Sequence, residues 1–243
     1  MYEEEIQVAV KHFEDILREQ IERAKRIREE GDWINYSKLK PIIIGVAGGD
    51  GIGPYITEQA QRVLEFLLQN EIQEGKVEFR KIEGLTIENR MKHMQVVSDD
   101  VLEEIKKCHV LLKGPTTTPK KGDPWPNIES ANVALRRALD LFANVRPVKV
   151  PELGIDWVFL RENTEGAYML GSHGIMIDNE LAIDFRVITA PGVERIIRAA
   201  FEYAKKNSRR KVTVVTKANV IKKGDGLFLE MAEKVAKGYP EIE

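Results

Sequence analysis

The feature that most constrains the fold is a continuous apolar run at residues 42–47 (IIIGVA), which is followed at once by a glycine-rich turn. An apolar run without polar alternation is typical of a strand that is buried on both faces of a parallel sheet. After the turn, apolar residues recur at helical spacing, and Pro54 suits the first turn of a helix. These residues are Ile56, Ala60, Val63, Leu64, Leu67 and Leu68. The segment therefore predicts a strand, a tight turn and a helix.

The glycine-rich turn (GGDGIGP) does not match the nucleotide-binding pattern of a Rossmann fold. That pattern, G-x-G-x-x-G, requires a third glycine after Gly49 and Gly51, and this sequence has Pro54 at the required position. Glycines at a strand-to-helix turn serve backbone geometry at least as often as ligand binding. The turn alone therefore does not predict a nucleotide site.

The remainder of the chain continues to alternate between strand and helix patterns. We expect strands at 76–82, 109–112, 157–160 and 211–216, and helices after Ser98, at 131–142, after Thr189 and at 227–236. Between them, residues 169–188 mix glycines with β-rich alternation. Strands that alternate with helices predict an α/β fold.

The N-terminus predicts an amphipathic helix over residues 3–30, with Gly31 as its C-terminal cap. Its apolar stripe comprises Ile6, Val10, Phe13, Leu17, Ile21, Ala24 and Ile27. The helix can serve as an arm that binds a partner or a second subunit. The alternative, which we favour, is that the stripe packs on the body of its own subunit.

Composition excludes several classes of protein. The 243 residues carry a net charge of −2 with both signs interspersed, which does not indicate binding to nucleic acid or to an anionic membrane. The single cysteine, Cys108, excludes an intrachain disulfide, and the acidic start (MYEEEIQ) is unlike a signal peptide. No apolar run approaches membrane-spanning length. These features predict a cytoplasmic protein.

Residues 127–168 carry the candidate ligand-binding side chains. Asn132 and Arg136 are four residues apart in a predicted helix and therefore share one face. The other candidates are Ser130, Arg146, Arg161 and Tyr168. Because guanidinium groups bind carboxylates bidentately, convergent arginines suit a small molecule with two or three carboxylates. The alternative is that each arginine is a solvated or salt-bridged surface group.

Two further segments hold candidate polar contacts. The threonine-rich turn at 113–119 (KGPTTTP) can contact a ligand, or it can be a turn that hydrogen-bonds to itself. Lys217 and Asn219 lie two apart after a predicted strand, so they point to one side if the extended geometry persists. The histidines at 12, 93, 109 and 173 show no metal-ligand spacing.

Several of these motifs, in their order, resemble the isocitrate and isopropylmalate dehydrogenase family of β-decarboxylating dehydrogenases. The motifs are GGDGIGP, KGPTTTP, ESANVALRRALDLFANVRPVK, RENTEGAY and VVTKANVIKKGDG. The resemblance covers residues 41–243 and implies a three-layer α/β/α fold that is not a Rossmann fold, with two subdomains. It implies the first part of a large domain at 41–141 and a small domain at 142–243 with a dimer arm at about 166–188. Residues 1–40 form a helical extension outside the resemblance.

The resemblance also implies an activity, which is oxidation of a 2-hydroxy acid followed by loss of the β-carboxylate. A nicotinamide nucleotide, NAD or NADP with NAD favoured, accepts the hydride, and Mg²⁺ or Mn²⁺ assists. Family members continue well beyond Glu243, and we expect the metal ligands in that continuation, so the chain is expected to be incomplete at its C-terminus. The family's lysine enters the site from a neighbouring subunit, which implies a homodimer with shared active sites.

Residue roles follow from the matched motifs. The resemblance implies that Tyr168 donates a proton to carbon and that Lys217 handles the hydroxyl proton, with Asn219 beside it. The remaining implied contacts are Arg136, Arg146 and Arg161 to the substrate carboxylates, and Thr117 and Thr118 to the cofactor.

Ser130 and Asn132 indicate isocitrate as the substrate, because a hydroxyl and an amide can hydrogen-bond its third carboxylate. Isopropylmalate enzymes resemble one another in placing leucines here. Homoisocitrate, tartrate or malate analogues and isopropylmalate are alternatives, as is a non-catalytic regulatory subunit.

Overall fold

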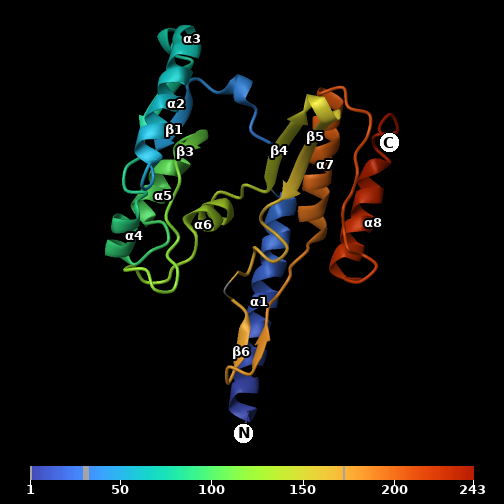
Figure 1. Ribbon diagram of the computed structural model, residues 1–243. Helices are drawn as coiled ribbons and strands as arrows, with labels where there is room; N and C mark the ends of the chain where they lie inside the picture. The colour runs from blue at the N-terminus through green and yellow to red at the C-terminus, as the bar shows by residue number, and fades with distance from the viewer. Residues whose placement is uncertain (1, 30–32, 172) are drawn as a thin grey trace. The chain divides into compact units, whose positions relative to one another are not determined.

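The computed structural model describes residues 2–29, 33–171 and 173–243, and the chain forms two compact units (Figure 1). Residues 32–140 form one unit, here called the parallel-sheet unit. Residues 1–31 and 141–243 form the other, here called the hairpin unit. Both units combine helices and strands, which confirms the α/β prediction. Among the described residues, no helix is long and apolar enough to cross a membrane.

The parallel-sheet unit is built around three parallel strands in the order β2-β1-β3. The strands are β1 (Ile42–Ala47), β2 (Val77–Lys81) and β3 (Val110–Lys113). The apolar run is the central strand, and its last four residues are buried, as a strand with neighbours on both sides requires. The predicted strands at 42–47, 76–82 and 109–112 are therefore confirmed, with small differences at their ends.

Helices connect these strands and contribute part of the core of the unit. They are α2 (Gly53–Leu67), α3 (Gln69–Gln73), α4 (Ile87–His93), α5 (Asp99–Lys106) and α6 (Ala131–Ala138), with the 3-10 helix η1 (Tyr36–Lys38). The core comprises Ala47, Ile82, Leu85, Val101, Ile105 and Leu135. In contrast, α2 exposes Val63, Phe66 and Leu67, at 58%, 71% and 64% of their surface.

Helix α6 is shorter than its sequence pattern predicts. We expected a helix over 131–142, but α6 ends at Ala138. Asp140 adopts a positive φ of 45°, a left-handed conformation that is incompatible with a continuing α-helix. The strand β4 then begins only three residues later, at Ala143. The apolar residues after 138 therefore belong to the connection and not to a helix face.

The hairpin unit contains a long antiparallel pair, β4 (Ala143–Val150) and β5 (Ile155–Glu162). The 3-10 helix η2 (Pro151–Leu153) joins the two strands, so the predicted strand at 157–160 is confirmed within β5. Pro147 is tolerated in β4 because a two-stranded ladder leaves one edge of each strand without a partner.

Helix α7 (Ala190–Lys206) packs beside this hairpin, and α8 (Gly224–Ala236) packs against α7. Thr189 caps α7 by accepting a hydrogen bond from the Gly192 amide at 3.1 Å, as the predicted helix start required. The core of the unit comprises Val193, Ile196, Ile197, Phe201, Ala204, Met231, Ala232 and Ile242. Leu160 of β5 packs against this core, which fixes the inner face of the hairpin.

A second, smaller hairpin consists of β6 (Ile175–Ile177) and β7 (Leu181–Ile183). It lies within the predicted dimer arm at about 166–188. An isolated bridge between Gly166 and Val187 closes the base of this segment. Leu181 and Ile183 expose 48% and 42% of their surface.

The predicted strand at 211–216 is absent. Backbone pairing occurs only at the beginning of this segment. The Val212 amide donates to the Glu243 carbonyl at 2.7 Å, and the Glu243 amide donates to the Arg210 carbonyl at 2.8 Å. A strand requires a continuing ladder, and these bonds reach no further. The backbone then turns, since the Lys217 carbonyl accepts from the Val220 amide at 2.9 Å. The extended geometry that would point Lys217 and Asn219 to one side therefore does not persist.

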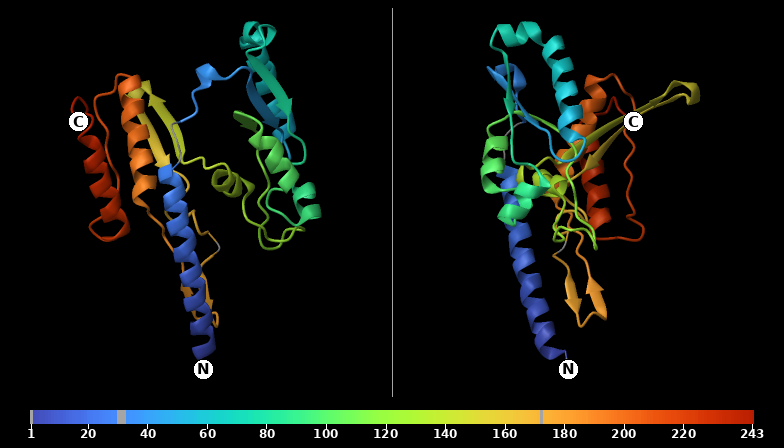
Figure 2. Two further views of the ribbon diagram at one scale, coloured as in Figure 1. Left: turned by 180° about the vertical axis from the view of Figure 1, so that it is seen from behind. Right: turned by 60° about the vertical axis from the view of Figure 1, so that its left-hand side comes forward.

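The N-terminal helix α1 (Glu3–Glu29) is present, and its buried face overlaps the predicted stripe only in part, since Phe13 stacks on Phe185 with ring centres 5.4 Å apart. Figures 1 and 2 show α1 running along the β6–β7 hairpin, with its C-terminal end beside α7, and it contacts both β6 and α7. Its buried residues are Ile16, Gln20 and Arg23. Members of the predicted stripe, among them Leu17 and Ile21, remain 46% and 56% exposed. Gly31, the predicted cap, lies outside the described residues.

Candidate active site

The register of β4 and β5 places two of the predicted arginines on one face of the hairpin. Arg146 lies opposite Phe159, and residues directly opposite each other in an antiparallel pair share a face. Arg161 is two residues from Phe159 and therefore points to that same face. Asn144, which is opposite Arg161, accepts a hydrogen bond from Arg146 Nε at 2.9 Å. The two guanidinium groups are thus diagonal neighbours.

The predicted arginines do not pair with protein carboxylates. Within the ranges that the structure describes, Arg136, Arg146 and Arg161 form no ion pair with an aspartate or a glutamate. Arg137, next to Arg136, does form an ion pair, with Glu129. The salt-bridged form of the alternative is therefore not supported for these three arginines, whereas Arg146 is exposed, as a solvated surface group would be.

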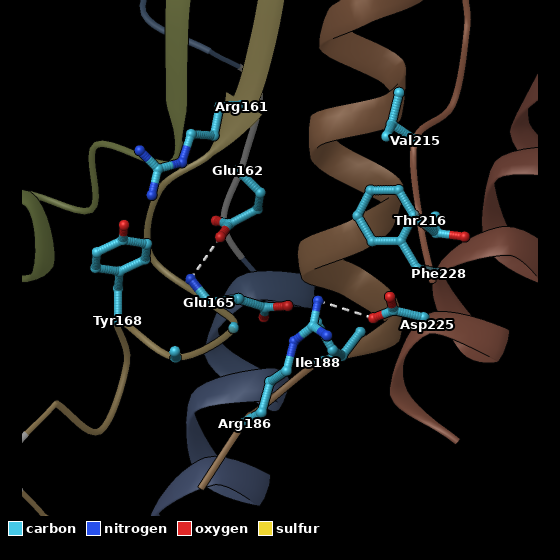
Figure 3. Close-up of a pocket in the computed structure, with 12 residues that line it drawn as sticks. Arg161, Glu162, Glu165, Tyr168, Arg186, Ile188, Val215, Thr216, Asp225 and Phe228 are labelled. Carbon is cyan, nitrogen blue, oxygen red and sulfur yellow. Dashed lines mark hydrogen bonds and ion pairs between the residues drawn. The ribbon is translucent and has the colours of Figure 1, made fainter. Parts of the chain in front are cut away.

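Arg161 also lines a cavity of about 460 Å³ in the hairpin unit (Figure 3). Its guanidinium carbon lies 4.5 Å from the ring centre of Tyr168, which is a cation–π contact. The other lining residues are Glu162, Glu165, Gly166, Ala167, Arg186, Ile188, Val215, Thr216, Asp225 and Phe228. The structure therefore brings two predicted site residues, Arg161 and Tyr168, to one cavity wall.

A carboxylate at the end of β5 shapes the loop that carries Tyr168. Glu162 accepts the backbone amide of Thr164 at 3.0 Å and the Thr164 hydroxyl at 2.8 Å, and it also accepts the Glu165 amide. These bonds fold the chain sharply after the strand. Burial raises the pKa of the Glu162 carboxyl, and the hydrogen bonds from Thr164 oppose that shift.

Glu165 is a site residue whose role the sequence did not indicate. It is almost fully buried and accepts the Thr189 amide at 2.9 Å, so its charge lies at the start of α7. Gly192 is needed beside it, because a Cβ at that position would lie 2.1 Å from Glu165 Oε1. Arg23 of α1 pairs with the same oxygen, Nη1 to Oε1, at 2.9 Å. A buried carboxylate of this kind cannot be distinguished from a surface glutamate by sequence pattern.

Asp225 organises the opposite wall of the cavity. It is buried, pairs with Arg186 (Nη2 to Oδ1, 2.8 Å) and accepts the Lys217 backbone amide at 2.7 Å (Figure 3). Thr216 lines the cavity, whereas Lys217 and Asn219 are exposed and are not among its lining residues. Asp225 and Arg186 were not predicted as site residues.

In the parallel-sheet unit, Asp50 fixes the threonine-rich loop. Its two carboxylate oxygens accept the Ile87 amide at 2.7 Å and the Thr117 amide at 2.6 Å. Of the loop threonines, Thr116 accepts a hydrogen bond from Lys113 Nζ at 3.3 Å. Thr117 and Thr118 are exposed, and their hydroxyls bond to no described residue. The loop is thus partly self-bonded and partly open to a ligand.

The glycines of the preceding turn allow the backbone to approach this loop closely. A Cβ on Gly49 would lie 2.0 Å from the Pro115 carbonyl oxygen, and one on Gly114 would lie 1.9 Å from that of Gly48. Gly49 also has a positive φ of 72°. These glycines therefore serve the close approach of two backbone segments, which is the structural role that glycines at such a turn often have.

Arg90 is a second organising residue that the sequence did not reveal. It is fully buried, and its guanidinium donates to the carbonyls of Val96 (2.7 Å), Thr117 (2.7 Å) and Glu129 (3.2 Å). Burial lowers the pKa of Arg90, and the charge of Asp50 opposes that effect. Because Glu129 precedes α6, Arg90 links the threonine loop to the start of that helix.

Helix α6 carries the predicted substrate contacts of this unit. Ser130 is its N-cap residue, and Asn132 and Arg136 lie one turn apart on one face, as predicted. All three side chains are half-buried.

The described residues contain no group of three or more histidine, cysteine, aspartate or glutamate side chains placed to hold a metal ion.

Comparison with known proteins identifies relatives over most of the chain. The chain is 38% identical over 210 residues to homoisocitrate dehydrogenase from Methanocaldococcus jannaschii, which covers 80% of this chain and 57% of that protein. It is 40% identical over 209 residues to mitochondrial isocitrate dehydrogenase [NAD] regulatory subunit 2 from Arabidopsis thaliana, with 84% and 52% covered.

A solved structure and a family model agree with these relatives. Isocitrate dehydrogenase from Methylococcus capsulatus matches with a TM-score of 0.67 and 38% identity, over 83% of this chain and 58% of that one. The chain spans about half the length of the curated relatives it matches. Residues 43–243 match the family model described as isocitrate/isopropylmalate dehydrogenase. The chain therefore belongs to the isocitrate/isopropylmalate dehydrogenase family.

Proposed function

We propose that this chain forms part of an NAD(P)-dependent dehydrogenase that oxidises and decarboxylates isocitrate to 2-oxoglutarate, with NAD as the favoured nucleotide. The observation that carries the proposal is the face of β4 and β5, where Arg146 and Arg161 lie as neighbours without protein carboxylates, and Arg161 stacks on Tyr168. A pair of guanidinium groups beside a phenol suits a polycarboxylic acid that must receive a proton.

The roles of individual residues follow this chemistry. Arg146 and Arg161 hold substrate carboxylates, and Arg136 of α6 serves the same purpose. Lys217, assisted by Asn219, accepts the proton of the substrate hydroxyl as the ketone forms. After carbon dioxide leaves, Tyr168 donates its proton to the enolate carbon, which completes the balance of the reaction. Lys217 is not on the cavity wall of its own chain, which is compatible with a lysine that serves a second copy.

A bound nicotinamide nucleotide would supply the hydride acceptor. Thr117 and Thr118 are the proposed contacts for that nucleotide, since their hydroxyls are exposed on a loop that Asp50 and Arg90 hold in place. We assign no metal-dependent step to the residues described here.

Ser130 and Asn132 support isocitrate among the related acids, because both can hydrogen-bond a third carboxylate. A relative that is 38% identical is named for homoisocitrate, so that acid is the principal competitor. Isopropylmalate and tartrate or malate analogues remain further alternatives.

A spectrophotometric assay of the full-length or complemented protein tests the proposal. Each acid is supplied with Mg²⁺ or Mn²⁺ and with NAD⁺ or NADP⁺, and nucleotide reduction is followed by absorbance. Reduction with isocitrate alone is the expected result. Reduction with a different acid would keep the reaction class and overturn the assignment of Ser130 and Asn132.

A second candidate function is a non-catalytic regulatory subunit, which the 40% identity to a protein of that name favours. Isothermal titration of isocitrate, combined with the nucleotide-reduction assay, distinguishes a regulatory subunit from a catalytic one. A regulatory subunit should bind isocitrate and yet reduce no nucleotide in any combination of acid and metal, in a protein shown to be folded and complete.

We also propose a homodimer. The β6–β7 register places Ile175, Ile177, Leu181 and Ile183 on one face of the small hairpin. An apolar face on a two-stranded hairpin favours pairing with a second copy, in which the exposed strand edges would also be covered.

A further inference from the structure

Helix α1 lies outside the matched family region, yet it contacts the loop that carries Tyr168. Arg23 of α1 is 8% exposed, and its partner Glu165 is 3% exposed. Arg23 Nη1 lies 2.9 Å from Glu165 Oε1, and Arg23 Nη2 donates to Thr164 Oγ1 at 3.3 Å. One guanidinium thus binds two consecutive residues of the loop. Figure 3 shows α1, in blue, beside Glu165 and the cavity.

The bound residues are central to the loop between β5 and Tyr168. Glu165 lines the cavity, and Tyr168 follows it by three residues. The Glu165 amide is held by Glu162, and its carboxylate is held by Thr189 at the start of α7. Arg23 adds a third, ionic attachment to this residue. The position of Tyr168 therefore depends on a loop that is anchored partly from outside the family's own sequence.

The polar residues on the buried face of α1 indicate that the helix binds the loop specifically. A helix that only fills a core buries its apolar side. Helix α1 buries the polar Gln20 and Arg23 together with Ile16, while Leu17 and Ile21 stay about half exposed. Gln20 has no hydrogen-bond partner for its amide among the described residues, which makes this face costly for simple packing. Arg23, through its contacts with Thr164 and Glu165, gives this polar part of the buried face a partner on the loop.

We propose that α1 is a brace for the loop from Glu162 to Tyr168, and that Arg23 is a positioning residue for Tyr168 in the proposed reaction. The inference rests on the proposed function for its catalytic consequence. Arg195 also donates to Thr164 Oγ1, at 3.2 Å, so the loop keeps a second attachment when Arg23 is replaced. Loss of Arg23 is therefore expected to loosen the loop without unfolding the unit.

The test compares Arg23→Met with Arg26→Met in the full-length protein. Arg26 lies on the same helix and is exposed, so its replacement removes the same charge without touching the loop. For Arg23→Met we expect kcat to fall by about tenfold or more, because small misplacement of a reacting group slows the chemical step, while KM changes less than about twofold. Amide hydrogen exchange should rise in residues 163–168 and stay unchanged in α7.

A second variant, Arg23→Lys, keeps the proposal testable if Arg23→Met does not fold. Lysine keeps the charge beside Glu165 but cannot also reach Thr164 with a second nitrogen of a planar fork. We expect a folded protein with faster exchange at Thr164 and a kcat several-fold below the wild-type value.

Several results would overturn the brace. One is that Arg23→Met has the same kcat and the same loop hydrogen exchange as Arg26→Met. Another is that Arg23→Met loses kcat while exchange rises equally in α7. A third is that Arg23→Lys fails to fold. If the wild-type protein turns over no acid, the proposed function fails. Loop exchange in Arg23→Met against Arg26→Met then still decides whether α1 braces the loop.

Discussion

At the scale of single residues, two neighbouring carboxylates of the cavity have different environments. Glu165 has an ionic partner in Arg23, whereas the hydrogen-bond donors to Glu162 are the neutral groups of Thr164 and the Glu165 amide. Burial without a cation favours the protonated form, and the pKa of Glu162 is accordingly raised. The ionised form of Glu162 therefore destabilises the folded hairpin unit.

This difference predicts a pH dependence of stability. Because the folded pKa of Glu162 lies above its unfolded value, the folded state binds the proton more tightly. The resulting stability is present below the unfolded pKa, which is about 4.3 for glutamate, and is lost as the pH rises through the folded pKa. Glu162→Gln should remove this component. Urea unfolding at mildly acidic and neutral pH measures it, with the exposed Glu58→Gln as control. An unchanged pH dependence in Glu162→Gln would contradict the prediction.

A second residue-scale prediction concerns substrate choice at Ser130. Replacing Ser130 by leucine removes the hydroxyl that we assign to the third carboxylate of isocitrate. That carboxylate then loses a hydrogen-bond partner in the bound state. We expect kcat/KM for isocitrate to fall by roughly a hundredfold or more. Ser130→Thr retains the hydroxyl and should keep most of the activity. Wild-type kcat/KM in a folded Ser130→Leu protein would refute the assignment.

At the scale of elements, one guanidinium joins three segments of the parallel-sheet unit. Arg90 binds the carbonyls of Val96, Thr117 and Glu129, which lie after α4, in the threonine loop and before α6. Backbone carbonyls buried in loops require partners, since the loops provide no regular ladder. Arg90 therefore donates the hydrogen bonds to these loop carbonyls that neighbouring strands donate to one another in the sheet of this unit.

Arg90→Lys tests this role. An ammonium can reach one or two of the three carbonyls but not all of them in a plane, so we expect a loss of about 2–5 kcal/mol of unfolding free energy. The exposed Arg62→Lys on α2 is the matched control and should change stability by less than about 0.5 kcal/mol. Chemical denaturation of both variants provides the comparison. Equal midpoints would show that the three carbonyls find other partners.

At the scale of the whole molecule, the β6–β7 hairpin leads to a prediction about assembly. Leu181 is on the apolar face that we assign to the second copy, so Leu181→Glu places a charge in that contact. We expect the dissociation constant of the dimer to rise at least about tenfold, measured by sedimentation. Leu153→Glu, at an exposed leucine in η2, should leave the dissociation constant unchanged. A monomeric wild-type protein, or equal constants for both variants, would contradict the proposed contact.

Much of the fold was determined by the sequence itself. The run at 42–47 became the central parallel strand, and the spacing of Asn132 and Arg136 placed both on one face of α6. The ordered motifs identified the family before any geometry was known. These features depend on local sterics and on hydrophobic periodicity, which neighbouring residues encode.

The burial of charged side chains and the pairing of strand patterns depended on contacts formed in the folded chain. Arg23 and Glu165 are 142 residues apart in sequence, and Arg90 reaches segments up to 39 residues away. The strand pattern at 211–216 met only Glu243 and remained a loop. A buried charge is stable only beside its partner, and a strand forms only beside a continuing neighbour, so both outcomes depend on contacts that local sequence does not contain.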